Sequence, residues 1–199
     1  MTEYYAPTYV LFGKGAQNEV GRILKERGIG KVLIHFGGGS VVRSGLLGVV
    51  EASLEENGIS FVELGGVQPN PRLSLIRKGI ALAKEEGVDM VLSVGGGSAL
   101  DSSKAIAYGV RYDGDVWDLY ARHVAPKAVL PVGCVITLAA TGSEMSNSSV
   151  VTNDEVLPNE KLGCNSNFGR PMVAFMNPEL TYTVSPYQTG CGSVDIMMH

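Results

Sequence analysis

The chain has 199 residues and a formal net charge of −4, and 45% of its residues are hydrophobic. A chain of this length can bury roughly 70% of its unfolded surface, so one sound core is feasible. The acidic balance and the lack of basic runs argue against nucleic acid as the main partner. No stretch reaches the ~20 apolar residues of a membrane span. The first residues lack the pattern of a secretory signal, so we expect no membrane association.

Strands and helices are predicted to alternate from the start of the chain to about Gly109. Asn18 is a plausible cap for the first helix, and Gly28 is a plausible stop. Strands are expected at 9–12, 32–36, 59–64 and 90–94, and helices at 18–27, 45–56, 73–86 and 99–108. Strands that alternate with helices predict βαβ units and a mostly parallel sheet. The fold class is therefore α/β, Rossmann-like, with helices flanking the sheet.

The alternation stops after Gly109. A turn-rich stretch is expected earlier at 65–71, and polar, glycine-bearing sequence separates the later elements. Those elements are strands at 129–136, 148–152 and 172–175 and a helix at 186–199. The chain has an odd number of cysteines and no Cys-x-x-Cys spacing, which predicts reduced thiols and a cytoplasmic location. They are Cys134, Cys164 and Cys191.

Three glycines and a serine follow two of the predicted strands, at 37–40 and again at 95–98. Glycine lets backbone N–H groups approach a ligand closely, and a helix that begins there adds free donors suited to phosphate. Ligands of parallel sheets bind beyond the carboxyl ends of the strands, where both turns fall. The sequence therefore predicts one dinucleotide held at two places.

The second glycine turn continues into Asp101 and Lys104, and it is neither a Walker A loop nor a G-x-G-x-x-G motif. We expect Gly96, Gly97 and Ser98 to hold a pyrophosphate at a helix N-terminus. Asp101 is expected in the first helical turn, where a carboxylate suits the helix dipole. The alternative is a glycine turn with an acidic first turn and no ligand.

Two later segments carry polar chemistry. Small and hydroxyl residues at 136–144 can line a groove for a flat ring or a phosphate, although a polar strand end explains them equally well. Asp195 and His199 are four residues apart, so a helix places both within reach of one ion. Oxygen and imidazole donors suit Fe²⁺, Zn²⁺ or Mn²⁺. The spacing alone favours a surface Asp–His pair over a metal site.

Taken in order, these motifs resemble the iron-containing alcohol dehydrogenase family over essentially the whole chain. The matching segments are 95–104, 137–144, 177–180 and 192–199. The chain departs from the family pattern at Asn177, where the family has Asp, and in the four-residue spacing of Thr137 and Thr141. The segments 37–40 and 65–71 resemble the butanol-dehydrogenase-like, NADP-preferring branch.

The resemblance implies a dehydroquinate synthase-like N-terminal domain and hydride transfer between a nicotinamide cofactor and a short-chain alcohol or aldehyde. Gly96, Gly97 and Ser98 would bind the pyrophosphate. Thr137, Leu138 and Thr141 would line the path to the nicotinamide, and Asn147 and Lys161 would lie in the cofactor cleft. Asp195 and His199 would be the first two of four ligands to a divalent metal, Fe²⁺ or Zn²⁺, which would act as a Lewis acid.

The first glycine turn bears on which nicotinamide cofactor binds. Many NAD enzymes place a carboxylate after the second strand to hold the ribose 2′-OH. Here Gly38 and Gly39 stand at that place, followed by Ser40 and Arg43. A carboxylate would repel a 2′-phosphate, whereas these residues would accept one. We therefore expect NADP(H) in preference to NAD(H).

The resemblance also implies a second, helical domain with two further histidine ligands, and neither His35 nor His123 matches them. We expect a dinucleotide-binding domain at 1–184, and at 185–199 the first helix of a metal-binding domain that the chain does not complete. Such a chain would keep mainly cofactor binding, and its exposed apolar face would favour homo-oligomers. The alternatives are a non-catalytic nucleotide-binding module and a glycerol dehydrogenase-like enzyme.

Overall fold

The computed structural model describes residue 1 and residues 5–198. Its centre is a six-stranded sheet in the order β1-β8-β5-β4-β2-β3, in which every neighbouring pair is parallel. The strands are β1 (Tyr9–Phe12), β2 (Lys31–Gly37), β3 (Ser60–Val67), β4 (Met90–Gly95), β5 (Val132–Ile136) and β8 (Val173–Met176). The predicted α/β class with a parallel sheet is confirmed.

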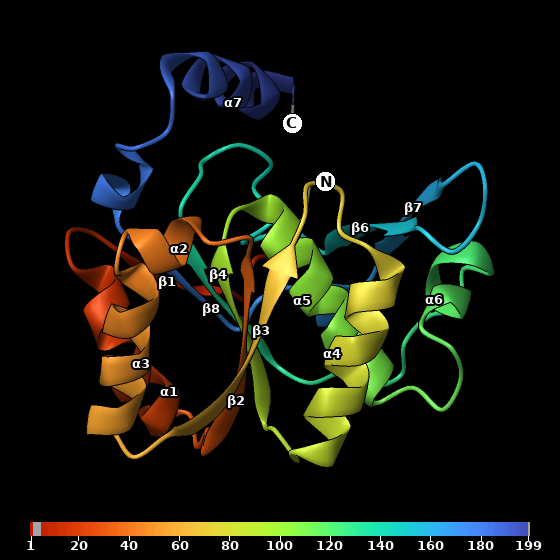
Figure 1. Ribbon diagram of the computed structural model, residues 1–199, viewed down its shortest axis with the longest axis horizontal. Coiled ribbons are helices and arrows are strands. Elements are labelled where there is room, and N and C mark those ends of the chain that lie inside the picture. The colour runs from red at the N-terminus through yellow and green to blue at the C-terminus, as the bar shows by residue number, and fades with distance from the viewer. Residues whose placement is uncertain (2–4, 199) are drawn as a thin grey trace.

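Helices cover both faces of the sheet (Figure 1). On one face lie α1 (Val20–Glu26) and α3 (Leu46–Glu56), and on the other lie α4 (Leu73–Glu85) and α5 (Gly97–Val110). The remaining helices are α2 (Ser40–Arg43), α6 (Trp117–Ala121) and α7 (Pro186–Met198). A separate antiparallel hairpin is formed by β6 (Ser148–Asn153) and β7 (Glu160–Asn165). No described helix combines the length and the hydrophobicity needed to span a lipid bilayer.

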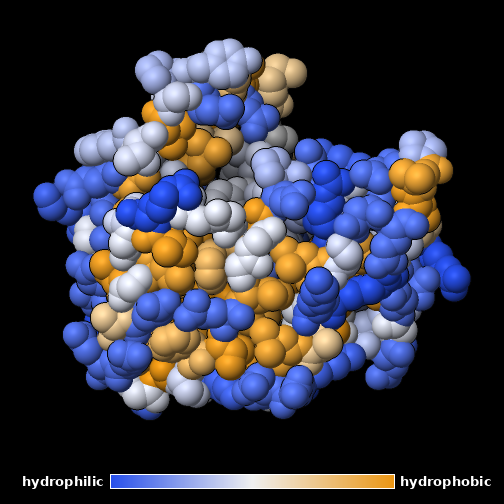
Figure 2. Space-filling view, in the orientation of Figure 1, coloured by the Kyte–Doolittle hydropathy of each residue, from blue (hydrophilic) through white to orange (hydrophobic). Residues whose placement is uncertain are grey.

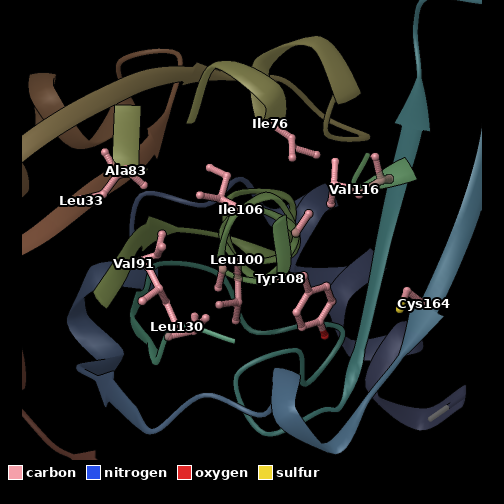
Figure 3. Packing of buried hydrophobic residues seen from close by; sticks show 14 of the residues in the cluster. Leu33, Ile76, Ala83, Val91, Leu100, Ile106, Tyr108, Val116, Leu130 and Cys164 are labelled. Carbon is pink, nitrogen blue, oxygen red and sulfur yellow. The ribbon is translucent and has the colours of Figure 1, made fainter. Parts of the chain in front are cut away.

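Two hydrophobic clusters, one on each face, hold the helices to the sheet. Successive side chains of a strand point to opposite faces. Val91 therefore packs with α4 and α5, whereas Met90 and Leu92 pack with α1 and α3. Figure 3 shows the first cluster, where Val91, Leu100 and Ile106 bring β4 and α5 together. In Figure 2, apolar side chains gather over β3, the edge strand nearest the viewer.

The sequence located most elements, and the differences have physical causes. Asn18 does not cap α1, because a 3₁₀ turn at Ala16–Glu19 precedes the helix and contains Asn18. Gly28 does follow the helix end, with a φ of 75° that suits glycine. Strand β3 continues through the predicted turn at 65–66, because its pairing with β2 resumes at Val67 after a shift in register. The Phe36 ring fills the space that a side chain at Gly65 would need.

Helix α6 and strand β7 were not predicted. β7 is mostly exposed and lacks alternation of apolar residues, so its sequence carries no strand signal. Strand β7 forms because it pairs with β6, and in this pairing Thr152 lies opposite Lys161.

The order of the strands explains where ligands can bind. From β2 the chain runs outward to β3 and then returns across β2 to β4, so the direction of winding reverses between β2 and β4. Such a reversal leaves a crevice beyond the carboxyl ends of the two strands. Phe36 pairs with Val94, so the glycine turns that follow these residues lie side by side.

His35, in the middle of β2, is fully buried and links the sheet to α5. Its Nδ1–H donates to the Leu64 carbonyl at 2.7 Å, and its Nε2 accepts from the Ser102 hydroxyl at 2.8 Å. Burial lowers the pKa of His35 to about 4, and the Leu64 hydrogen bond opposes this shift. His35 is therefore a core residue.

This burial predicts acid sensitivity. Below its ordinary pKa of 6.5 the unfolded chain binds a proton that the folded chain does not, down to a pH of about 4. The free energy of unfolding should therefore fall by about 3 kcal/mol across this window because of His35. Urea denaturation at several pH values should show a shallower pH dependence in His35→Gln. His123→Gln, at an exposed position, is the control, and equal pH slopes in the wild type and His35→Gln would contradict the assignment.

Candidate functional site

Both glycine turns open onto one cleft of about 550 Å³, which we call the glycine-turn cleft. Ser40 comes from the first turn and Gly96 from the second, and Thr137 and Leu138 come from the segment after β5. The far wall is formed by residues that lead into α7 and by its first turn: Glu179, Leu180, Thr183, Val184, Ser185 and Gln188. The structure thus brings the two turns together at the reversal of the sheet.

The first turn places a cation rather than an anion next to its glycines. Gly39 has a φ of 122°, a conformation that favours glycine, and α2 begins directly after it. A Cβ at Gly39 would lie 3.1 Å from the Arg43 guanidinium, whereas a Cβ at Gly38 would meet open space. The acidic residue of this cleft, Glu179, is paired with Lys14 at 3.0 Å.

The second turn begins α5 against the 137–141 segment. Gly95 has a φ of 152°, and the helix starts at Gly97. A Cβ at Gly96 would lie 3.5 Å from Leu138, and one at Gly97 would lie 3.1 Å from the Thr141 hydroxyl. The glycines therefore leave room for backbone N–H groups at a helix N-terminus, where an anion is favoured.

Asp101 does not lie in the first turn of α5, so that prediction was wrong. The helix begins at Gly97, which puts Asp101 one turn further along. Its carboxylate accepts from the Ser143 hydroxyl at 2.7 Å and from the Val150 amide at 3.1 Å. Burial raises the pKa of Asp101, and the Ser143 hydrogen bond and the nearby Lys104 oppose this shift. Asp101 fastens the 141–148 loop to α5.

Lys104, one turn beyond Asp101, is fully buried and is surrounded by oxygen atoms of the same loop. Its ammonium donates to the Ser143, Ser146 and Ser148 carbonyls at 2.8 to 3.0 Å, and the Ser143 hydroxyl lies 3.0 Å away. Burial lowers the pKa of Lys104 to about 8, and attraction to Asp101 opposes this shift. The loop is therefore folded around a cation that α5 supplies.

A second cavity of about 290 Å³, the hairpin cleft, lies between the second glycine turn and the β6–β7 hairpin. Gly97, Ser98 and Asp101 form one wall, and Thr141 and Lys161 belong to the same lining. Leu138 lines both clefts and so lies between them. Asn147 lines neither cleft, and its amide donates to Asn167 at 3.4 Å.

Helix α7 brings Asp195 to the same edge of the molecule. A Cβ at Gly192 would lie 2.6 Å from the Ala139 carbonyl oxygen, so only glycine allows α7 to approach this backbone. Asp195 lines a small cavity with Leu138, Ala140 and Cys191. In Figure 2 the surface is hollowed beneath α7.

His199, the second predicted metal ligand, lies outside the described residues. Among the described residues no three His, Cys, Asp or Glu side chains gather as a metal ion would require. A carboxylate and an imidazole four residues apart fit part of a site for Fe²⁺ or Zn²⁺, which takes at least three protein ligands in catalytic centres.

Comparison with known proteins decides the family. The model of the iron-containing alcohol dehydrogenase family matches residues 7–178. The chain belongs to the iron-containing alcohol dehydrogenases. It is 47% identical over 197 residues to NADH-dependent butanol dehydrogenase A of Clostridium acetobutylicum, covering 99% of this chain and 50% of that protein. It is 36% identical to the NADPH-dependent aldehyde reductase YqhD of Escherichia coli, covering 98% and 50%.

The solved structures agree with this assignment. A butanol dehydrogenase of Thermotoga maritima, described as NADH-dependent, superimposes with a TM-score of 0.96 at 40% identity, covering 100% of this chain and 50% of that one. The chain spans about half the length of the curated relatives that it matches. The family assignment made from the sequence motifs is confirmed.

Sequence reasoning missed several residues that build the site. Ser143 and Val150 hold Asp101, and Asn70 contacts Lys161, but none of these contacts follows from spacing. Lys104 belonged to a motif, yet its four oxygen neighbours come from a loop more than 35 residues away, as the 39-residue separation from Ser143 shows. The glycine at Gly192 was a usable signal, because a glycine inside a predicted helix indicates close packing.

The Lys104 network predicts a large loss of stability when the cation is removed. Lys104→Met leaves three buried carbonyls without their donor and removes the positive charge near the buried Asp101 carboxylate, which should lower the free energy of unfolding by about 3–5 kcal/mol. Lys78→Met makes the same change at an exposed position of α4 and should alter it by less than about 0.5 kcal/mol. Chemical denaturation measures both. A loss below about 1 kcal/mol for Lys104→Met would refute the role given to the buried ammonium.

Proposed function

We propose that this chain contributes the cofactor-binding part of a metal-dependent alcohol/aldehyde oxidoreductase. The reaction would transfer a hydride between a nicotinamide cofactor and a short-chain alcohol or aldehyde. The observation that carries the proposal is that both glycine turns line one cleft at the reversal of the sheet. The names of its relatives, butanol dehydrogenase and aldehyde reductase, support this substrate class.

In this proposal the two clefts together bind the nicotinamide cofactor. Gly96, Gly97 and Ser98 would bind the pyrophosphate at the N-terminus of α5. Thr137, Leu138 and Thr141 would line the path to the nicotinamide, since Leu138 lies where the two clefts meet. Asp101 supports these residues by holding the 141–148 loop, and Lys161 would face the cofactor from the hairpin cleft. Asn147 keeps its proposed role only through resemblance.

Asp195 and His199 would supply two of four ligands to Fe²⁺ or Zn²⁺. When bound, such a metal polarises the substrate oxygen as a Lewis acid. We infer that residues 1–184 bind the cofactor, because both glycine turns lie within them, and that 185–199 belong to a metal-binding unit. No three potential ligands gather among the described residues, so this unit would need further ligands. The chain by itself should then bind the cofactor without efficient catalysis.

We further propose a cytoplasmic location and self-association. The described cysteines are free, which suits a reducing compartment. Helix α7 exposes Tyr187, Val194, Ile196, Met197 and Met198, and apolar surface of this kind favours contact with another chain.

Titration of the chain with NADPH, followed by cofactor fluorescence, tests the proposed function. Binding should occur without added metal. Oxidation of NADPH by butyraldehyde should stay near background with Fe²⁺ or Zn²⁺, because the metal site is incomplete. Absence of binding would refute the proposal. Rapid turnover by the chain alone would refute the limited role given to it.

The preferred cofactor is proposed to be NADP(H). The first turn carries no acidic residue and has the Arg43 guanidinium beside Gly39, so it can accept a 2′-phosphate. The relatives carry names of both kinds: the Clostridium enzyme is called NADH-dependent and the Escherichia enzyme NADPH-dependent. NADH preference is therefore the competing outcome.

Gly38→Asp tests this preference, because an added side chain at Gly38 meets open space. The new carboxylate should weaken NADPH binding about tenfold relative to NADH through repulsion of the 2′-phosphate. Gly38→Asn, of the same shape without the charge, should leave the ratio unchanged. Tighter binding of NADH than NADPH by the unsubstituted chain would contradict the preference.

A further inference from the structure

Arg77 of α4 joins two segments that lie far from it in the sequence. Its Nε and Nη2 donate to the two carboxylate oxygens of Asp115 at 2.9 and 3.0 Å. Its Nη1 donates to Glu155, in the connection between β6 and β7. Two parallel hydrogen bonds to one carboxylate and a third to another hold the guanidinium in one orientation. The three charges therefore form a network with defined geometry, unlike an isolated surface ion pair.

Two successive residues of the β6–β7 connection are fastened to one face of α4. Asp154 accepts from the Ser74 amide and hydroxyl at 3.1 and 2.6 Å, in the first turn of the helix. Ser74 and Arg77 are three positions apart and so share a face of the helix. Ser74 thus holds Asp154 at the helix start, and Arg77 holds Glu155 about one turn further along.

The other partner of Arg77, Asp115, begins a segment that also contacts the hairpin. The Asp115 carboxylate accepts from the Trp117 amide at 2.8 Å, at the start of α6. The Tyr120 hydroxyl of α6 lies 2.7 Å from the Ser149 hydroxyl of β6, and the Tyr120 ring stacks on Trp117. The hydrogen bond from Arg77 lowers the pKa of Asp115, and burial opposes this shift. Arg77 therefore links α4 to the hairpin and to the helix beside it.

These attachments bear on the hairpin cleft, although Arg77 does not line it. Val150 and Lys161 contribute the hairpin side of this cleft. Without the guanidinium, Asp115 and Glu155 would lose the cation that pairs with both, and their mutual repulsion would favour displacement of the hairpin. We propose that Arg77 is a positioning residue that latches the β6–β7 hairpin onto α4 and so sets the width of the hairpin cleft. For the bound cofactor, this inference rests on the proposed function.

The Arg77 latch is exposed enough for dissolved ions to weaken it. The side chains of Arg77, Asp115 and Glu155 are 35%, 46% and 47% exposed. Salt screens such pairs, because the Debye length falls from about 10 Å at 0.1 M to about 3 Å at 1 M. The hairpin should therefore loosen as the ionic strength rises.

Hydrogen exchange of the cofactor-free chain tests the latch by itself. In Arg77→Met the backbone amides of β6 and β7 should exchange about fivefold faster through local opening, while those of the central sheet keep their rates. Arg22→Met is the matched control. Arg22 also pairs with two carboxylates, Glu19 and Glu26, but both lie in its own segment of the chain. Its loss should leave the exchange of the hairpin unchanged.

Trp117, the single tryptophan, gives a second readout beside the latch. Its fluorescence should change when NaCl is raised from about 0.05 to about 1 M in the unsubstituted chain, because screening weakens the ion pairs. In Arg77→Met this response should be absent. An equal response in both chains would contradict a salt-sensitive latch.

Titration of the full chain with NADPH and NADH tests the effect on the cleft. Arg77→Met should weaken both cofactors about fivefold, a size typical of residues that act without touching the ligand. Arg77→Lys keeps the charge but loses the planar fork, so it should weaken them by less. Arg22→Met should change neither affinity.

The two measurements separate the possible failures. Unaltered hairpin exchange in Arg77→Met, or an equal change in Arg22→Met, would overturn the latch. Faster hairpin exchange with unaltered cofactor affinity would overturn its control of the cleft while leaving the proposed function intact. Absence of cofactor binding by the unsubstituted chain would refute the proposed function, and hydrogen exchange would still decide whether Arg77 holds the hairpin.

Discussion

The site depends on one constraint of the sheet, the parallel pairing of β2 with β4 across the reversal in winding. Phe36 and Val94 lie opposite each other in this pair, so the chain leaves both strands at the same edge. Each strand then breaks into glycines and begins a helix, which turns backbone donors toward the same space. The two turns therefore form one cleft because of strand pairing, although 58 positions separate Gly38 and Gly96.

Polar contacts between residues far apart in the sequence build the remaining walls of the site. The 141–148 loop is held by Asp101 and Lys104, and the β6–β7 hairpin is held by the start of α4. In both cases a helix holds a segment that lies outside the central sheet. The glycine turns directly follow strands of the central sheet. The walls opposite them depend on the hydrogen bonds that hold the loop and the hairpin to the helices.

Much of this arrangement could be predicted from the sequence, for identifiable reasons. Strands and helices of the first half follow from apolar periodicity, and the turns follow from glycine. The wrong predictions share one cause: the spacing of residues in the sequence does not show which residues meet in the folded structure. The negative charge of Asp101 suits the first turn of a helix, but α5 begins at Gly97 and the Asp101 carboxylate instead accepts a hydrogen bond from Ser143. Strand β7 exists only because β6 pairs with it.

The ammonium of Lys104 occupies the place that a bound metal ion takes in many polar loops, coordinated by carbonyl oxygens. Here the ion is tethered to α5 by its own carbon chain. It cannot be lost by dialysis, removed by a chelator or exchanged for another ion. The loop beside the glycine turn therefore needs no metal ion to keep its shape, and its order is coupled to the folding of the helix that supplies the charge.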